Sequence, residues 1–147
     1  MSDLFVRDVM TAAVLVATPE CRYQQIVDVL TGYDVSGLPV VDDNDHVIGM
    51  VSEADVLRPN GHDTARELMT SPAVTVDAAA PVGGAVDLME RHHLKRLAVT
   101  DGPDGRLVGI VTRRDILRHA VRGDETSRRD RPDDVLVQHY VAGAGSR

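Results

Sequence analysis

The chain of 147 residues repeats one sequence pattern, and this duplication constrains its fold more than any other feature. Matching residues are 59 positions apart in the first two matching segments and 60 apart in the third. The second copy therefore carries one extra residue, in a Gly-Pro-Asp-Gly turn at residues 102–105. A repeat of this length indicates one structural unit used twice. The matching segments are residues 7–11 and 66–70, 38–42 and 97–101, and 49–58 and 109–118.

Each copy predicts the order strand, helix, hairpin, helix. In the first copy, the apolar run at residues 14–16 predicts a strand. We expect the next helix to begin at the capping residue Thr18, with Pro19 in its first turn. Two apolar runs flank the polar turn at residues 42–45 and predict a hairpin. A helix of little more than one turn then follows from Ser52, and the second copy repeats this order with a longer final helix.

The pattern divides the chain into three segments. We expect residues 1–60 to form the first repeat and residues 61–123 the second. Residues 124–147 begin with a charged, proline-containing stretch without apolar periodicity, which predicts a flexible polar tail. Within that tail, the apolar residues between 135 and 141 predict a short helix or strand.

Composition is typical of a soluble globular protein, with 43% hydrophobic and 27% charged residues. No run approaches the roughly 20 apolar residues of a membrane-spanning helix. The N-terminus lacks a basic region followed by an apolar run, so we expect no signal peptide and a cytoplasmic protein. Cys21 is the only cysteine, which excludes an internal disulfide and a cysteine-rich zinc site.

The charge pattern opposes nucleic-acid binding and separates the two halves of the chain. The net charge is −7, and the sequence has one Phe, three Tyr and no Trp. Residues 1–62 hold 3 Arg and 10 Asp/Glu, a balance of −7, whereas residues 63–147 hold 13 of each sign. An anionic ligand would therefore meet less repulsion in the second half.

The ordered motifs resemble the CBS domain, and two of them in tandem resemble a Bateman module. The resemblance covers about residues 6–121 and depends on three features that have a counterpart in each copy. They are Met-Thr before the first strand, the strand Leu-Pro-Val-Val-Asp at residues 38–42 (Leu-Ala-Val-Thr-Asp at 97–101), and the ending Gly-Φ-Val-Ser/Thr-x-x-Asp-Φ-Leu, in which Φ is apolar. It implies a mixed α/β (α+β) fold of two βαββα repeats packed with pseudo-two-fold symmetry. It also implies a homodimer formed through helices, and adenosine nucleotides bound in two clefts between the repeats.

The Ser/Thr-x-x-Asp element occurs as Ser52 with Asp55 and as Thr112 with Asp115. At a helix start, backbone N–H groups and the helix dipole favour an anion, and the hydroxyl adds a donor for a phosphate. A carboxylate one turn later accepts hydrogen bonds from the two hydroxyls of a ribose. The same residues are also typical of a capping box, and the two roles are compatible.

The resemblance implies that each cleft combines the Ser/Thr-x-x-Asp element of one repeat with the first-strand backbone of the other. The backbone of that strand would contact the adenine edge. Cleft A would contain Ser52, Asp55, Ala73 and Val74, and cleft B would contain Thr112, Asp115, Ala13 and Val14.

A basic pair distinguishes the two repeats. Lys95 and Arg96 precede the hairpin of the second copy, where the first copy has Ser36 and Gly37. The resemblance implies that such a pair reaches the phosphates of the ligand, here chiefly in cleft A. A solvated strand edge that discourages aggregation is the alternative interpretation. We expect cleft A to prefer a phosphorylated adenosine, and cleft B to be empty, weaker, or occupied by a less charged ligand.

The resulting hypothesis is a stand-alone sensor that binds AMP, ADP, ATP or another adenosyl ligand and acts on an unidentified effector protein. The alternative is a ligand-free dimerisation or interaction protein whose clefts are vestigial. The sequence contains no nucleophile elbow, P-loop or metalloprotease motif. We therefore expect no catalytic residue, no metal site, and no nucleic-acid or membrane partner.

Overall fold

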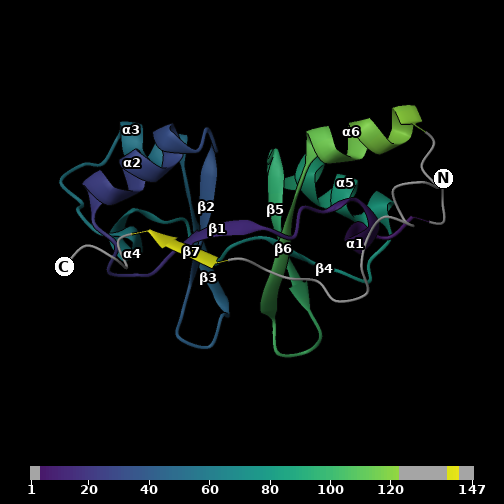
Figure 1. The fold of residues 1–147 in the computed structure, drawn as a ribbon, viewed down its shortest axis with the longest axis horizontal. Coiled ribbons are helices and arrows are strands. Elements are labelled where there is room, and N and C mark those ends of the chain that lie inside the picture. The colour runs from purple at the N-terminus through teal and green to yellow at the C-terminus, as the bar shows by residue number, and fades with distance from the viewer. Residues whose placement is uncertain (1–3, 123–138, 143–147) are drawn as a thin grey trace. The chain divides into compact units, whose positions relative to one another are not determined.

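The computed structural model describes residues 4–122 and 139–142, and its chain divides into two compact units, each with its own sheet and core (Figure 1). Unit 1 contains the described residues 4–14 and 74–122. Unit 2 contains residues 15–73 and 139–142. In each unit, helices cover one face of the sheet.

Unit 2 is built around a four-stranded sheet with the order β3-β2-β1-β7. Strand β1 pairs with β2 in parallel, and β2 and β3 form the antiparallel hairpin expected from the sequence. The elements of this unit are β1 (Val14–Ala17, whose first residue is assigned to unit 1), α2 (Tyr23–Gly32), β2 (Gly37–Val41), β3 (Val47–Ser52), α3 (Glu53–Leu57), α4 (Ala65–Leu68) and β7 (His139–Ala142).

Unit 1 repeats this arrangement around a three-stranded sheet with the order β4-β5-β6. Strands β4 and β5 are parallel, and β5 and β6 form the second hairpin. Both copies therefore have the predicted βαββα order, and the mixed α/β fold class is confirmed. The elements are α1 (Val6–Val9), β4 (Thr75–Asp77), α5 (Val82–His92), β5 (Arg96–Asp101), β6 (Arg106–Thr112) and α6 (Arg113–Arg122).

The short helix that begins each repeat packs in the unit formed mainly by the other repeat. Helix α1 lies in unit 1, where the Val6 N–H donates to the Ala80 carbonyl at 2.8 Å. Helix α4 lies in unit 2, where the Ala65 N–H donates to the Cys21 carbonyl at 2.8 Å. The repeats expected at residues 1–60 and 61–123 therefore do not coincide with the compact units.

Each exchanged helix contributes fully buried side chains to the core of its unit. Val6 is completely buried in unit 1 beside Leu97 and Val111, and Ala65 is completely buried in unit 2 beside Ile26. Removing one Val or Leu side chain from water is worth about 1.5–3 kcal/mol. The exchanged helices therefore contribute directly to the stability of each unit.

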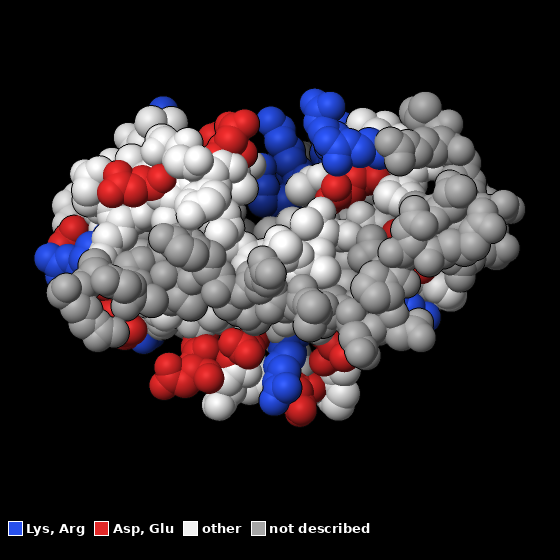
Figure 2. Space-filling view, in the orientation of Figure 1, with Lys and Arg blue, Asp and Glu red and all other residues white. Residues whose placement is uncertain are grey.

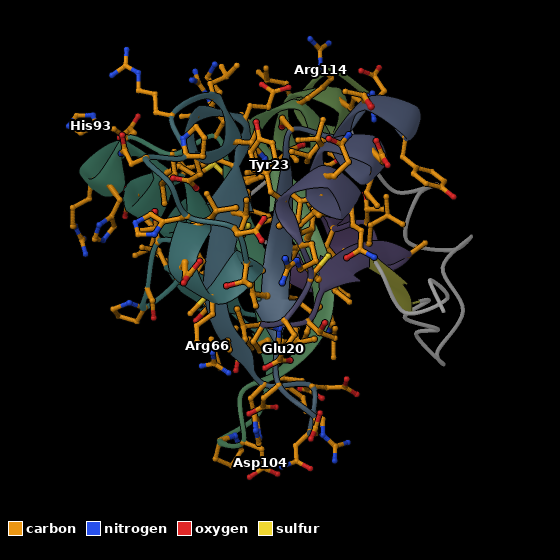
Figure 3. The ribbon with its side chains drawn as sticks, turned by 90° about the vertical axis from the view of Figure 1, so that its left-hand side faces the viewer. Glu20, Tyr23, Arg66, His93, Asp104 and Arg114 are labelled. Atoms are coloured by element: carbon orange, nitrogen blue, oxygen red, sulfur yellow. The ribbon has the colours of Figure 1, made fainter. Side chains whose placement is uncertain are left out.

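The start of α2 differs from the sequence prediction. The helix begins at Tyr23, with Arg22 as its N-cap, rather than at Thr18. The segment before Tyr23 forms backbone hydrogen bonds with α4 instead. The Pro19 carbonyl accepts from the Arg66 N–H at 2.9 Å, and the Cys21 carbonyl accepts from the Ala65 N–H. Arg66 also forms an ion pair with Glu20, at 3.5 Å (Figure 3). A tertiary contact from the second repeat thus overrides the local helix-start signal.

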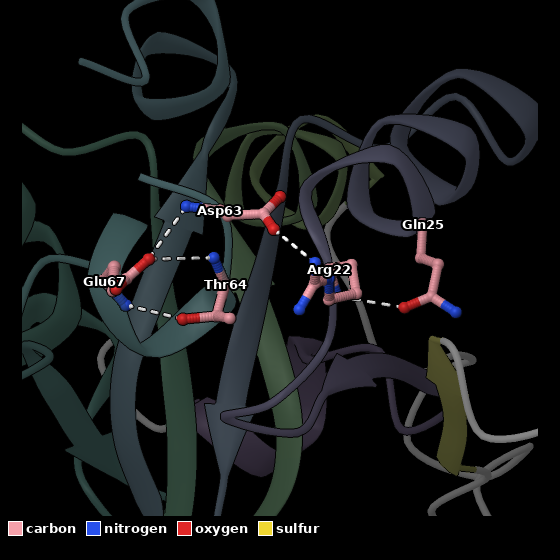
Figure 4. Close-up of polar contacts among 5 residues, drawn as sticks. All are labelled: Arg22, Gln25, Asp63, Thr64 and Glu67. Carbon is pink, nitrogen blue, oxygen red and sulfur yellow. Dashed lines mark hydrogen bonds and ion pairs between the residues drawn. The ribbon is translucent and has the colours of Figure 1, made fainter. Parts of the chain in front are cut away.

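Polar contacts connect the starts of α2 and α4 (Figure 4). Arg22 forms an ion pair with Asp63 at 2.7 Å, and the Arg22 N–H donates to Gln25 Oε1 at 2.9 Å. Glu67 Oε1 accepts from the N–H groups of Asp63 and Thr64, at 2.8 and 3.3 Å, and the Glu67 N–H donates to Thr64 Oγ1 at 3.4 Å. These backbone N–H groups hold the pKa of Glu67 below its usual value.

Part of the tail predicted at residues 124–147 is described. Residues 139–142 form strand β7 beside β1, so a strand is found where the sequence allowed a helix or a strand. Residues 123–138 and 143–147 lie outside the described part of the chain, and the prediction of a flexible tail concerns them.

Candidate functional site

The first Ser/Thr-x-x-Asp element lies where β3 ends and α3 begins. Ser52 is the N-cap of α3 and has an extended backbone, with φ −113° and ψ 172°. Its N–H and its hydroxyl both donate to Asp55 Oδ2, at 2.8 and 3.1 Å. All hydrogen bonds described for the Asp55 carboxylate thus use Oδ2, which leaves Oδ1 for an additional donor.

The second element, at the start of α6, has a different hydrogen-bond pattern. The Thr112 N–H donates to Asp115 Oδ2 at 3.0 Å, and the Asp115 N–H donates back to Thr112 Oγ1 at 3.1 Å. This is the reciprocal capping box that the sequence allowed as one interpretation. Asp115 is 9% exposed, and its Oδ1 lies 3.8 Å from Nη1 of Arg118. The Thr112 hydroxyl therefore accepts a hydrogen bond, whereas that of Ser52 donates one.

The residues proposed for cleft B fall in one compact unit. Ala13, Val14, Thr112 and Asp115 all belong to unit 1. The chain just before Ala13 is attached to β6, because Thr11 and Ile110 exchange backbone hydrogen bonds of 2.8 and 2.9 Å. The exchange of α1 thus carries the beginning of the first repeat to the strand that ends at Thr112.

The residues proposed for cleft A belong to both units. Ser52, Asp55 and Ala73 lie in unit 2. Val74, Lys95 and Arg96 lie in unit 1. The combination of these six residues in one cleft stays a prediction.

Lys95 lies beside the start of α6 in unit 1. Its carbonyl accepts from the Arg113 N–H at 3.0 Å, and both residues line a groove of about 550 Å³ between α5 and α6. Arg96 instead begins β5 and lies opposite Thr112 in the sheet register. Lys95 therefore lines the groove, whereas Arg96 lies in the sheet. Their adjacency in sequence does not predict this difference.

The groove itself was not anticipated from the sequence. Its walls include Met89, Ile116 and Leu117, and Leu117 is 61% exposed. The signal available in the sequence was a leucine at the equivalent position of both repeats, Leu57 and Leu117. In the structure Leu57 is 78% exposed. Both repeats therefore expose a large apolar side chain at the same position.

Cys21 is the one cysteine of the chain, and it is buried. Burial raises the pKa of the Cys21 thiol to about 11, so it is protonated at neutral pH and is a poor nucleophile. In residues 4–122 and 139–142, no group of three or more His, Cys, Asp or Glu side chains could hold a metal ion. Nor does any helix in these ranges have the length and apolar character needed to cross a bilayer.

The family model described as "CBS domain" matches the chain twice, at residues 6–59 and 65–122. The chain belongs to the CBS-domain family. Both matches contain one Ser/Thr-x-x-Asp element, so the duplication and the two helix starts described above are features of a CBS pair.

The chain is similar to CBS-containing proteins of different lengths. It is 33% identical to Hypoxic response protein 1 of Mycobacterium tuberculosis over 144 residues, which cover 92% of this chain and 91% of that protein. It is also 34% identical to inosine-5'-monophosphate dehydrogenase of Halobacterium salinarum over 113 residues, or 75% of this chain. That match spans only 22% of the length of the dehydrogenase.

Solved structures show the same fold. The AMP complex of CBSX2 has a TM-score of 0.75 and 30% identity, covering 80% of this chain and 96% of that one. Hypoxic Response Protein I, crystallised with two coordinated zinc ions, has a TM-score of 0.71 and 32% identity, covering 79% and 98%. CBSX2 from Arabidopsis thaliana, with 28% identity and coverage of 80% and 94%, also has a TM-score of 0.71.

Proposed function

We propose that this CBS pair is a non-catalytic regulatory module that binds an adenosine-containing ligand and acts on an effector protein as a homodimer. The observation that carries the proposal is the Ser/Thr-x-x-Asp element at the start of both α3 and α6. The AMP complex of CBSX2, which is 30% identical, supports the choice of ligand class. The similarity to Hypoxic response protein 1, which covers 92% of this chain and 91% of that protein, supports a regulatory module built on a CBS pair.

The chemistry of the helix starts suits a nucleotide. Asp55 uses Oδ2 for its own helix, so Oδ1 can accept from a ribose hydroxyl. In cleft B, the dipole of the ten-residue helix α6 would favour a phosphate at its N-terminus, with Arg113 and Arg114 beside it. Cleft A stays our preferred site for a phosphorylated ligand, because only the second repeat supplies Lys95 and Arg96.

Calorimetric titration with AMP, ADP, ATP and S-adenosylmethionine tests the proposal. The variants Asp55→Asn and Asp115→Asn keep an acceptor for the helix cap and remove the carboxylate charge. We expect Asp55→Asn to weaken binding of the phosphorylated ligand by about tenfold or more, because a charge-assisted hydrogen bond to the ribose is lost. Asp115→Asn should affect a second, weaker binding event.

Asp28→Asn is the matched control, since Asp28 is an exposed residue of α2 away from both helix starts. It should bind every ligand as the unmodified chain does. Failure of all four ligands to bind at submillimolar concentration would contradict the proposal, as would binding that neither cleft variant changes.

Two observations favour a second function, that of an interaction protein with vestigial clefts. Leu57 and Leu117 are exposed on the helices of the two units, and Ser36 and Gly37 replace the basic pair in the first repeat. On this view the chain would dimerise without any nucleotide. Sedimentation equilibrium of the ligand-free chain, compared with the calorimetric titration, separates a dimer that binds nucleotides from one that does not.

A further inference from the structure

We infer that Arg118 weakens the binding of ribose hydroxyls in cleft B, because it pairs with the Asp115 carboxylate that would accept them. The inference rests on the proposed function, since it concerns how each cleft would hold the ribose of an adenosine-containing ligand. It uses contacts within unit 1 and compares them with the equivalent contacts within unit 2. Because Arg118 acts through Asp115, it is a positioning residue.

Both Ser/Thr-x-x-Asp elements are followed by an arginine three residues after the aspartate. Residues 55–58 are Asp-Val-Leu-Arg in the first repeat, and residues 115–118 are Asp-Ile-Leu-Arg in the second. Side chains three residues apart are neighbours on the surface of an α-helix. The same aspartate–arginine pair would therefore form in both repeats if both segments were helical throughout.

The segment of the second repeat is helical throughout. Helix α6 begins at Arg113 and continues to Arg122, so Arg118 lies about one turn after Asp115. Arg118 Nη1 lies 3.8 Å from Asp115 Oδ1, which is an ion pair at the spacing i, i+3. Cleft B therefore contains a carboxylate that already has a cationic partner from its own helix.

The segment of the first repeat stops being helical before its arginine. Helix α3 ends at Leu57, and Arg58 has a non-helical backbone with φ −133° and ψ 68°. Pro59 comes next, and a proline disfavours helical geometry in the residue before it. Among the residues that the structure describes, no ion pair involves Asp55. The length of the helix thus decides whether the arginine reaches the carboxylate.

The two carboxylates consequently differ in what they can offer a ligand. Asp115 Oδ2 accepts from the Thr112 N–H at 3.0 Å, and Oδ1 faces Arg118. The Asp115 side chain is only 12% exposed, so water and salt screen this pair less than they screen one at an open surface. Asp55 uses Oδ2 for both of its described hydrogen bonds and keeps Oδ1 for another donor.

A neighbouring cation reduces what a carboxylate gains from a hydroxyl. A hydrogen bond from a ribose hydroxyl to a carboxylate is strong because the acceptor is charged. The Arg118 guanidinium lowers the negative potential at Asp115 Oδ1 and occupies one side of that oxygen. A ribose hydroxyl should therefore gain less free energy at Asp115 than at Asp55.

The other cations near Asp115 act on a different part of the ligand. Figure 2 shows Lys and Arg side chains gathered around the start of α6, which carries Arg113 and Arg114. These side chains, with Arg118, would attract a phosphate, so the total affinity of cleft B combines two opposite effects of Arg118. A comparison of two ligands with the same phosphate isolates the effect on the hydroxyl. AMP and 2′-deoxy-AMP are such a pair.

Calorimetric titration of the full chain with AMP and with 2′-deoxy-AMP tests the inference. The Asp55→Asn variant leaves Asp115 as the carboxylate of the helix starts, and we expect it to prefer AMP only about threefold. Addition of Arg118→Ala should raise this preference about threefold further, because the carboxylate loses its competing partner. Arg118→Lys should restore the lower preference, since it keeps a cation at this position.

The first repeat offers a matched control. In the Asp115→Asn variant, Asp55 is the remaining carboxylate, and we expect a preference for AMP of about tenfold or more. Addition of Arg58→Ala should leave that preference unchanged, because Arg58 has the same sequence position as Arg118 but lies outside its helix. An AMP preference that Arg118→Ala does not change, or that Arg58→Ala raises equally, would overturn the inference.

The outcomes distinguish this inference from the proposed function. Failure of every variant to bind AMP would remove the proposed function and the inference together. AMP binding that depends on Asp55 and Asp115, with a preference over 2′-deoxy-AMP that is insensitive to Arg118, would remove the inference alone. Because the Arg118 side chain is 61% exposed, its replacement should leave the fold intact, and far-ultraviolet circular dichroism of each variant checks this.

Discussion

Met10 lies directly against Gly109, although the two residues belong to different repeats. A β-carbon on Gly109 would lie 2.6 Å from Met10 Sδ and 2.9 Å from the Thr11 carbonyl oxygen. The same relationship joins Met69 to Gly49 in unit 2. In both units a glycine in the last strand of the hairpin thus provides the space into which the exchanged segment packs.

Gly109→Ala should destabilise the chain by about 1–3 kcal/mol, because the new methyl group overlaps a backbone oxygen that cannot move independently. Gly49→Ala should cost less, since its contacts are with the flexible Met69 side chain. Gly83→Ala is the control, because nothing lies within 4 Å of that position in α5 and helix propensity predicts a gain. Urea unfolding of the three variants measures these differences. Equal stability of Gly109→Ala and the unmodified chain would contradict the packing described here.

Fragments cut at unit boundaries should be more stable than fragments cut at repeat boundaries. Residues 15–73 keep α4 with the core of unit 2, whereas residues 1–60 lack α4 and carry α1 without the core that buries it. We expect cooperative urea unfolding, followed by circular dichroism, for residues 15–73 and not for residues 1–60. The opposite order would mean that the exchanged helices are dispensable.

The sequence predicted the βαββα order of both copies because apolar periodicity and turn residues are local signals. It did not predict the exchange of α1 and α4, since nothing local distinguishes packing in one's own repeat from packing in the other. The sequence predicts a start of α2 at Thr18 because it too contains only local signals. The signals at Thr18 and Pro19 are genuine, but the Pro19 carbonyl bonds to Arg66, a partner that only the tertiary structure supplies.

Removal of the two capping hydroxyls should have unequal effects. Thr112→Ala deletes the acceptor of the Asp115 N–H at the start of α6 and should cost about 1 kcal/mol. Ser52→Ala removes only a second donor to Asp55 Oδ2, which the Ser52 N–H continues to bind, so it should cost less than about half as much. Thermal unfolding of both variants measures the difference. Equal losses would indicate that the Ser52 hydroxyl also accepts from a backbone N–H of α3.

Glu67 should make stability depend on pH in the acid range. The N–H groups of Asp63 and Thr64 hold the pKa of Glu67 below its ordinary value of 4.5 in the folded chain. The contribution of this carboxylate is therefore complete above pH 4.5 and is lost as pH falls through the lowered pKa. We expect Glu67→Gln to be less stable than the unmodified chain above pH 5 and to lose less stability on acidification. Urea midpoints between pH 3 and 6 measure this dependence.

Asp87→Asn is the control for this experiment, because it removes an exposed carboxylate from α5. Its acid profile should parallel that of the unmodified chain. A Glu67→Gln profile parallel to that of the unmodified chain would show that these N–H groups do not lower the pKa as described.

The candidate site was predictable to the extent that its residues are adjacent in sequence. Ser52 with Asp55, and Thr112 with Asp115, were found because helix capping has a short, local spacing. The relation of Lys95 to Arg113 was not found, because it arises from a hydrogen bond between the end of one segment and the start of another. The groove was not predicted either, because its lining brings Lys95, Arg113 and the exposed Leu117 together from two separate segments.

The exchange of α1 and α4 has a consequence for how such a chain could have arisen. A single repeat that held its first helix as here would leave that helix exposed and its core open, and the first helix of a second molecule could close the core. The ancestor before gene duplication would then have been a domain-swapped dimer, a low-cost way of joining two identical chains. Fusion of two copies would make this association intramolecular, and loss of either repeat would leave the other without part of its interior.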